Sequence, residues 1–173
     1  YRFFFWPGQN PEWSGVAWGS SHPHNNPNRD LMHTIERQVD QLRMVGIKDF
    51  DGPSCLSKLT ATVDQFNLPT KFALIVPGGA VHRPEKRWPV NNFIELARAL
   101  VADGIIPILL GGPAENSIVE NILSGCPSAR SLICKTSLLQ LAALARMAMV
   151  SVGNDTGPMH LIAAVGCPSV VLF

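Results

Sequence analysis

The pattern of apolar and polar positions changes character near Thr70. Beyond that point, short apolar runs that fit buried strands alternate with segments whose apolar residues recur at helical spacing. In chain order the pattern predicts a strand at 72–76, a helix around 93–101, a strand at 105–110, a helix at 114–123, a strand at 131–133, a helix beginning at Ser137, a strand at 149–152, a short helix after Gly157 and a strand at 169–173. Strands and helices that alternate in this way predict right-handed βαβ units. The fold class is therefore α/β, a Rossmann-like parallel sheet with helices on both faces.

The first 70 residues carry a weaker pattern. Up to about residue 28 the chain is rich in Pro, Gly, Asn and aromatic residues, and only 2–6 fits a strand. A helix is then predicted from an apolar stripe, with Pro27 and Asn28 before it and Gly46 after it. The stripe consists of Leu31, Ile35, Val39, Leu42 and Val45. Residues 48–70 fit a connection with at most one short strand, so we expect two parts, 1–70 and 71–173.

Composition restricts the classes of function. Apolar residues make up 46% and charged residues 16%, the mixture of a folded domain, and the net charge of +1 gives no general attraction to nucleic acid or an anionic membrane. The four cysteines form no C-x-x-C pair, which is typical of a reduced, intracellular protein. Apolar runs end well before the roughly 18 residues of a membrane span, and residues 1–6 lack the features of a signal peptide. We therefore expect no transmembrane segment, and a chain that begins inside a longer protein.

Two loops are expected to form a ligand site. In an open, doubly wound sheet, ligands bind at the carboxyl ends of the strands where the strand order reverses, so the loops 77–88 and 153–158 should meet there. Pro158 suits the first position of a helix, whose free amides and positive dipole end attract phosphate. Gly157 would allow close approach of a ligand, and His160 could add a donor. The alternative, that Asp155 or Thr156 only caps the helix and His160 is packed, stays open.

The opposite loop offers cations, and the next loop offers an acidic residue. Lys86 could neutralise a diphosphate from this position, although a solvated role is equally compatible with the sequence. Its neighbours His82, Arg83 and Arg87 are expected to face solvent. Glu115 follows Gly111-Gly112-Pro113, where a carboxylate could accept hydrogen bonds from ribose hydroxyls, or could simply lie in the first turn of a helix.

Other nucleotide and metal signatures are missing from the sequence. No G-x-G-x-x-G follows the first predicted strand and no P-loop motif occurs, which argues against a nicotinamide site and against a P-loop enzyme. His22, His24 and His33 lack partners at zinc-ligand spacing and are expected at the surface. No metal and no cofactor is expected.

The motifs of residues 72–173 resemble one known family. The segment Gly153-Asn-Asp-Thr-Gly-Pro-Met-His160 is similar to the donor-binding signature of glycosyltransferase family 9, the ADP-heptose:lipopolysaccharide heptosyltransferases. Three further motifs occur in the family's order, Pro77-Gly-Gly-Ala80, Lys86-Arg-Trp-Pro89 and Leu110-Gly-Gly-Pro-Ala-Glu115. The resemblance implies a GT-B enzyme, with two Rossmann-like domains, of which this segment is the C-terminal, donor-binding one.

The resemblance also implies roles for individual residues. Lys86 would contact the phosphates and Glu115 the ribose, while Thr136 would lie where the backbone meets the adenine. The diphosphate and sugar end would be held by a further group, namely Asp155, Thr156, Gly157 and His160. Some members carry hydroxyl residues where this chain has Val81 and His82, so that contact is not expected here.

The activity implied by the resemblance is transfer of a sugar from an ADP-activated donor to a lipopolysaccharide core or related glycan, with inversion and without a metal. Members use a carboxylate of the N-terminal domain as general base. The helix from Leu31 to Val45 looks like the last helix of that domain, so 1–70 would be a remnant of the acceptor side. The base would lie outside this chain, as would the closing elements of the donor domain. The expected location is the cytoplasm, with peripheral contact to the inner membrane left open. The alternatives are a non-catalytic nucleotide- or glycan-binding module and another enzyme with a nucleotide site, such as an epimerase or oxidoreductase.

Overall fold

The computed structural model describes residues 11–48, 60–79 and 84–173. The chain divides into two units, 1–51 and 52–173. The predicted strand at 2–6 lies outside the described residues.

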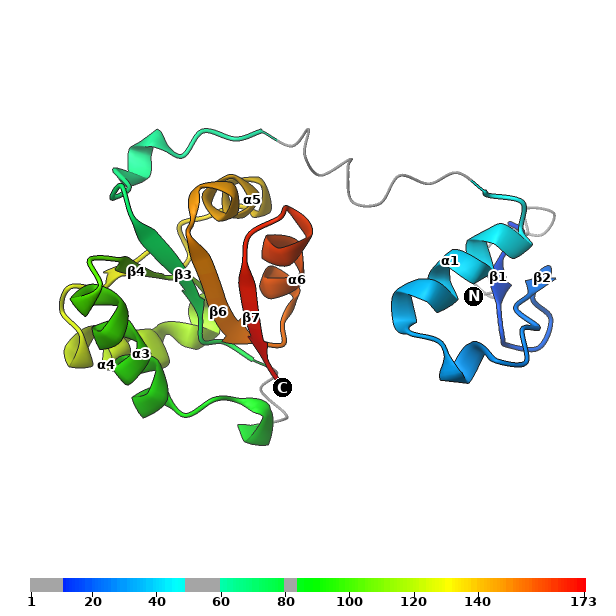
Figure 1. Cartoon of the computed structure of the whole chain (residues 1–173), viewed down its shortest axis with the longest axis horizontal. Helices are drawn as coiled ribbons and strands as arrows, with labels where there is room; N and C mark the ends of the chain where they lie inside the picture. Colours follow the sequence, from blue (N-terminus) through cyan, green and yellow to red (C-terminus); the bar gives the residue numbers. More distant parts are fainter. Residues whose placement is uncertain (1–10, 49–59, 80–83) are drawn as a thin grey trace. The chain divides into compact units, whose positions relative to one another are not determined.

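The first unit contains one helix and one small pair of strands (Figure 1). Its elements are β1 (Ser14–Gly15), β2 (His22–Pro23), the 3-10 turn η2 (Arg29–Leu31) and α1 (Thr34–Met44). The strands β1 and β2 pair in parallel, which the sequence pattern did not predict. None of the residues of α1 is buried, and Ile35 on its apolar stripe is 64% exposed.

Helix α1 begins later than predicted from Pro27 and Asn28. The Nδ1 atom of His33 accepts a hydrogen bond from the Ile35 amide, and the Glu36 carboxylate accepts one from the His33 amide. This reciprocal capping satisfies donors that would otherwise be free, so the helix starts at Thr34 and the preceding residues form η2 instead. The predicted end is confirmed, because Gly46 follows the helix with a φ of +87°.

The expectation that the histidines lie at the surface is wrong for His24. This side chain is buried, and its Nε2 atom lies 2.8 Å from Oδ2 of Asp40 in α1. The Asn26 side-chain amide donates to the same oxygen, also at 2.8 Å. The hydrogen bond with His24, followed by that from Asn26, holds the pKa of Asp40 below its usual value. This cluster joins the segment before α1 to the helix itself.

The second unit is built on a five-stranded, wholly parallel sheet in the order β5-β4-β3-β6-β7. Its strands are β3 (Phe72–Val76), β4 (Ile106–Leu109), β5 (Arg130–Ser131), β6 (Val150–Asn154) and β7 (Ser169–Leu172). Its helices are α3 (Val90–Ala102), α4 (Asn116–Gly125), α5 (Leu138–Met147) and α6 (Gly157–Ala164), with 3-10 turns η3 (Asp64–Phe66), η4 (Pro84–Lys86) and η5 (Pro113–Glu115). The predicted fold class is confirmed. The first and fourth strands of the unit, β3 and β6, are neighbours as expected.

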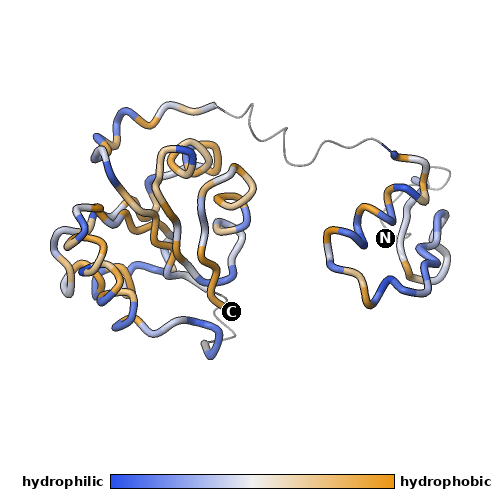
Figure 2. The backbone as a smooth tube through the Cα atoms, viewed as in Figure 1, coloured by the Kyte–Doolittle hydropathy of each residue, from blue (hydrophilic) through white to orange (hydrophobic). Residues whose placement is uncertain are grey.

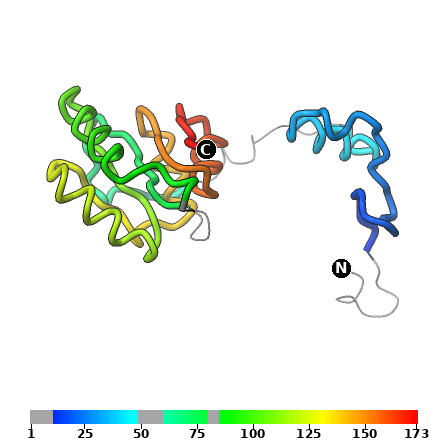
Figure 3. The backbone as a smooth tube through the Cα atoms, turned by 90° about the horizontal axis from the view of Figure 1, so that it is seen from below, coloured from blue at the N-terminus to red at the C-terminus, as the bar shows by residue number. Residues whose placement is uncertain are grey.

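Helices cover both faces of this sheet. Figure 1 shows α3 and α4 on one side and α5 and α6 on the other, and Figure 3 shows α3 and α4 side by side. All five residues of β3 are buried: Phe72, Leu74 and Val76 pack toward α5 and α6, and Ile75 packs toward α3 and α4. Hydrophobic residues accordingly concentrate in the strands and the helix faces against them (Figure 2). Burial on both faces explains why β3 reads as a continuous apolar run in the sequence.

The segment before β3 also packs into this unit. Val63 and Phe66, on either side of the start of η3, are buried in the same core as Phe72. Arg130 at the edge of the sheet donates two hydrogen bonds to the backbone here, to the carbonyl oxygens of Phe66 and Asn67 at 2.7 and 2.6 Å. Residues 60–70 contain η3 and no strand, so the short strand that the sequence allowed does not form there.

Candidate functional site

A cavity of about 300 Å³ opens at the carboxyl ends of β3, β4 and β6. This is the point where the strand order reverses, since β4 lies on one side of β3 and β6 on the other. The cavity is lined by four glycines, Gly78, Gly79, Gly111 and Gly112, by the polar residues Glu115, Thr136, Ser137 and Thr156, and by Val76, Leu110, Leu138, Leu141 and Pro158. The cavity lies where the sequence predicted a ligand site.

Glu115 fills the space between two glycine turns. A Cβ atom added to Gly78 would lie 2.9 Å from Cγ of Glu115, and one added to Gly111 would lie 2.9 Å from its Cβ. Any larger residue at either position would displace Glu115. The Gly112 amide donates to Oε2 of Glu115 at 2.8 Å, so one carboxylate oxygen is engaged within the turn. No described residue donates to Oε1, which leaves that oxygen for a ligand hydroxyl.

The wall formed by α5 changes from polar to apolar along its length. Thr136 and Ser137 precede the helix, and Leu138 and Leu141 follow. Ser137 and Gln140 form the predicted capping box, in which each side chain accepts a hydrogen bond from the other residue's amide. The start of α5 is therefore satisfied by the protein, and it presents two leucines to the cavity beside two polar residues.

The start of α6 is not satisfied in this way. Thr156 is the N-cap residue, yet its side chain caps no amide, and its Oγ1 atom is buried without a hydrogen-bond partner among the described residues. The helix begins at Gly157, one residue before Pro158, which had been expected to open it. A Cβ atom added to Gly157 would meet no atom within 4 Å. An unpartnered hydroxyl, uncapped amides and the positive end of the helix dipole are features that attract an anion.

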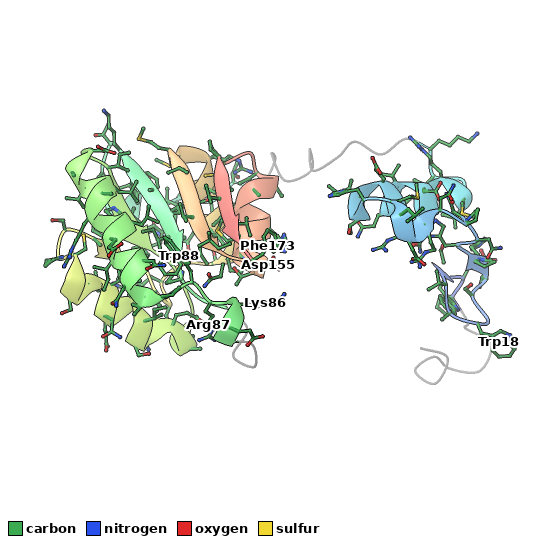
Figure 4. All side chains as sticks on the ribbon, turned by 60° about the horizontal axis from the view of Figure 1, so that its bottom comes forward. Trp18, Lys86, Arg87, Trp88, Asp155 and Phe173 are labelled. Atoms are coloured by element: carbon green, nitrogen blue, oxygen red, sulfur yellow. The ribbon has the colours of Figure 1, made fainter. Side chains whose placement is uncertain are left out.

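The other predicted residues lie at the rim. Nε2 of His160 lies 3.2 Å from Oδ1 of Asp155, and both side chains are substantially exposed. The sequence had left open that Asp155 only caps α6 and that His160 is packed in the interior. Asp155 does not cap the helix, and His160 is exposed. Lys86 is exposed at the end of η4, on the same edge of the unit as Asp155 (Figure 4). The structure thus gathers Glu115, Thr136 and Thr156 around the cavity. It leaves the other predicted residues outside the lining, namely Lys86, Asp155, Gly157 and His160.

Two residues missed by sequence reasoning hold the loop that carries Lys86. Asn154, at the end of β6, is buried and forms three hydrogen bonds with this loop. Arg87 was predicted to face solvent, but it is half-buried and its Nη2 atom donates to the Gly79 carbonyl oxygen at 2.6 Å. The sequence signal that could have identified Asn154 is a polar residue at the end of an apolar strand. A side-chain amide buried there must form hydrogen bonds with neighbouring segments. His82 and Arg83 lie outside the described residues.

Among residues 11–48, 60–79 and 84–173, no three His, Cys, Asp or Glu side chains are grouped so that they could hold a metal ion. In the same residues no helix has the length and apolar character needed to cross a membrane.

Comparison with known proteins gives consistent matches. The sequence profile of glycosyltransferase family 9 (heptosyltransferase) matches residues 13–173. Lipopolysaccharide heptosyltransferase 3 of Escherichia coli is 28% identical over 167 residues, which cover 90% of this chain and 48% of that protein. This chain therefore spans about half the length of that relative.

Solved structures share the fold. The glycosyl transferase family 9 protein from Veillonella parvula superposes with a TM-score of 0.72 at 21% identity, covering 94% of this chain and 51% of the other. The E. coli heptosyltransferase WaaC, solved with ADP, gives a TM-score of 0.69 at 23% identity, covering 91% and 52%.

Proposed function

Because the chain belongs to glycosyltransferase family 9, the heptosyltransferases, we propose that its second unit binds the nucleotide-sugar donor of a glycosyl transfer reaction. The observation that carries the proposal is the cavity at the reversal of strand order, where Glu115 and the uncapped start of α6 face the same space. A nucleoside diphosphate needs an acceptor for its ribose hydroxyls and donors for its phosphates, and this cavity offers both.

Within the cavity the nucleoside would lie against α5. The adenine would pack on Leu138 and Leu141, with the backbone at Thr136 beside its polar edge, and Glu115 would accept hydrogen bonds from the ribose through Oε1. An ADP-activated sugar is the donor we propose, in line with the relative solved with ADP. The acceptor would be a lipopolysaccharide core or a related glycan, the substrate class named for the E. coli relative.

The diphosphate would lie between the glycine turn and α6. The Thr156 hydroxyl and the amides around Gly157 would donate to its oxygens, and Lys86 would reach the outer phosphate from the rim, beside Asp155 and His160 at the sugar end. When the sugar leaves, negative charge develops on the β-phosphate. Donors already aimed at that charge lower the barrier, because they need no reorganisation during the reaction. Transfer with inversion, without a metal and in the cytoplasm, completes the proposal.

Calorimetry with ADP tests the site. Glu115→Gln keeps an oxygen that can accept from the Gly112 amide but removes the charge facing the ribose, so the Kd for ADP should rise about tenfold, the effect of about 1.4 kcal/mol. Glu120→Gln, on the exposed face of α4 and outside the cavity, is the matched control and should bind ADP as the wild type does. Absence of ADP binding by the wild-type protein, or equal affinity of the two variants, would refute this assignment of the cavity.

A further inference from the structure

Asn154 connects two parts of the chain that the proposed donor site needs at a fixed distance. It ends β6, one residue after Gly153, which pairs with Val76 at the end of β3. The residue is 1% exposed, so each polar atom of its side chain has to find a partner inside the protein. All of those partners belong to the loop 77–88 that follows β3.

The side-chain amide of Asn154 holds the start of the loop. Its Nδ2 atom donates to the carbonyl oxygens of Pro77 and Gly78, at 2.9 and 3.0 Å. The next carbonyl oxygen, that of Gly79, accepts from Arg87. Three successive carbonyl groups are therefore bound by side chains.

These bonds determine where the amides of the turn point. No peptide bond between described residues is cis, and in a trans peptide the C=O and N–H groups point in opposite directions. With the Pro77 and Gly78 carbonyl groups turned to Asn154, the amides of Gly78 and Gly79 point away from it. Both glycines line the cavity, and neither amide donates to a described residue.

The side-chain oxygen of Asn154 holds the end of the loop. It accepts from the Trp88 amide at 3.0 Å, and the Trp88 ring packs edge-on against Phe93 of α3 with their centroids 4.9 Å apart. Phe93 is fully buried, so this end of the loop is anchored in the core. Lys86 lies two residues before Trp88, so the hydrogen bond between the Trp88 amide and Asn154 also restricts the backbone position of Lys86.

We propose that Asn154 is a positioning residue for the donor's diphosphate: it holds the Gly78–Gly79 turn opposite the start of α6 so that the two glycine amides face the phosphates. The inference rests on the proposed donor site and deepens it. Asn154 touches no substrate, and it acts through the turn and through the loop that presents Lys86.

The test compares two ligands, because a merely structural role would affect both equally. In Asn154→Asp the side chain keeps its size and can still accept from Trp88, but it presents an oxygen to the Pro77 and Gly78 carbonyl groups and should release the turn. Calorimetry on the 173-residue protein with ADP and with adenosine should show the Kd for ADP rising about tenfold or more. The Kd for adenosine, which has no phosphate, should stay within about twofold.

Ser151→Ala is the matched control. Ser151 is also buried in β6 and bonds to Ser169 at 2.8 Å, but it lies outside the cavity lining. Its loss should lower the Tm and leave both affinities unchanged. Equal losses of ADP and adenosine affinity in Asn154→Asp, or no loss of either, would overturn the inference while leaving the donor site in place. A wild-type protein that binds neither ligand would instead refute the proposed function.

If Asn154→Asp does not fold, Arg87→Met tests the same claim at a half-buried position. This variant frees the Gly79 carbonyl group and leaves Asn154 in place. It should again weaken ADP binding and spare adenosine binding. Unchanged ADP affinity, or an equal loss for both ligands, would contradict the positioning role of these bonds.

Discussion

Replacing Gly157 by alanine should make the protein more stable and a weaker binder of ADP. Gly157 is the first residue of α6, its φ is not in the left-handed region, and an added Cβ atom would meet nothing within 4 Å. The folded protein therefore has room for the methyl group. If the diphosphate binds at the start of α6, however, the space is free because the ligand needs it.

The two expected effects can be estimated separately. A glycine-to-alanine change at a compatible helical position stabilises by about 0.4–1 kcal/mol, mainly because the unfolded chain loses freedom. For ADP, displacing a phosphate oxygen from one amide removes a hydrogen bond to a charged group, worth about 1.5–3 kcal/mol. The Kd for ADP should therefore rise by a factor between about 10 and 150.

Gly166→Ala provides the control at the other end of the same helix. Gly166 also has open space around it, but its φ is +91°, which strains any residue with a side chain. This variant should lose about 1 kcal/mol of unfolding free energy and keep its ADP affinity. Thermal unfolding measures the stability of each variant, and calorimetry measures its Kd for ADP.

The result that would refute the reasoning is a Gly157→Ala protein that binds ADP as tightly as the wild type. The phosphates would then not approach α6. A large loss of stability in the same variant would show instead that the surroundings of Gly157 are tighter than the structure indicates.

Three further outcomes follow from the structure. Gly153→Ala should destabilise the second unit by more than about 2 kcal/mol in denaturant unfolding, because its Cβ would lie 2.6 Å from the backbone oxygen of Val76, which cannot move aside; a loss below 0.5 kcal/mol would count against the packing described here. Lys86→Met should weaken ADP about threefold to tenfold at low salt with an unchanged Tm, since the side chain is exposed, and the difference should shrink at high salt; an unscreened effect would contradict the rim position. The pKa of Asp40 is lower in the folded protein than in the unfolded chain, so its contribution to stability is present above the unfolded pKa near 4 and is lost as the pH falls through the folded value. Asp40→Asn should remove this pH-dependent part of the stability. Acid unfolding followed through the NMR signals of His24 measures it, and identical acid unfolding of both proteins would contradict it.

The arrangement of the second unit could be predicted because its signals are local. Apart from β5, which is Arg130–Ser131 where a strand at 131–133 was predicted, the strands are mainly apolar runs and the helices carry apolar stripes. The capping box at Ser137 lies within four residues. The neighbouring positions of β3 and β6 then follow from the usual topology of such sheets. The cavity could be placed for the same reason, since it lies where these strands end.

The roles of individual polar side chains could not be predicted in this way. The partners of Asn154 lie 66 to 77 residues away in sequence, so no local pattern reports them. His24 bonds to Asp40, 16 residues away, and this explains why it is buried rather than exposed. The start of α1 was placed too early because His33 is an uncommon capping residue, whereas Pro27 and Asn28 fit the usual rules.

The two hydrogen bonds from Arg130 to the backbone at Phe66 and Asn67 have a practical consequence for dividing the protein. They attach the segment that precedes β3 to β5, the edge strand farthest from β7. Val63 and Phe66 of this segment are buried in the hydrophobic core of the same unit. A shortened gene that starts at Phe72 would keep all five strands of the larger sheet, but it would leave a cavity in the hydrophobic core and remove both hydrogen-bond acceptors of Arg130. A gene that starts at Thr60 would retain the buried side chains and the acceptors of Arg130, and we expect its protein product to be the more stable of the two.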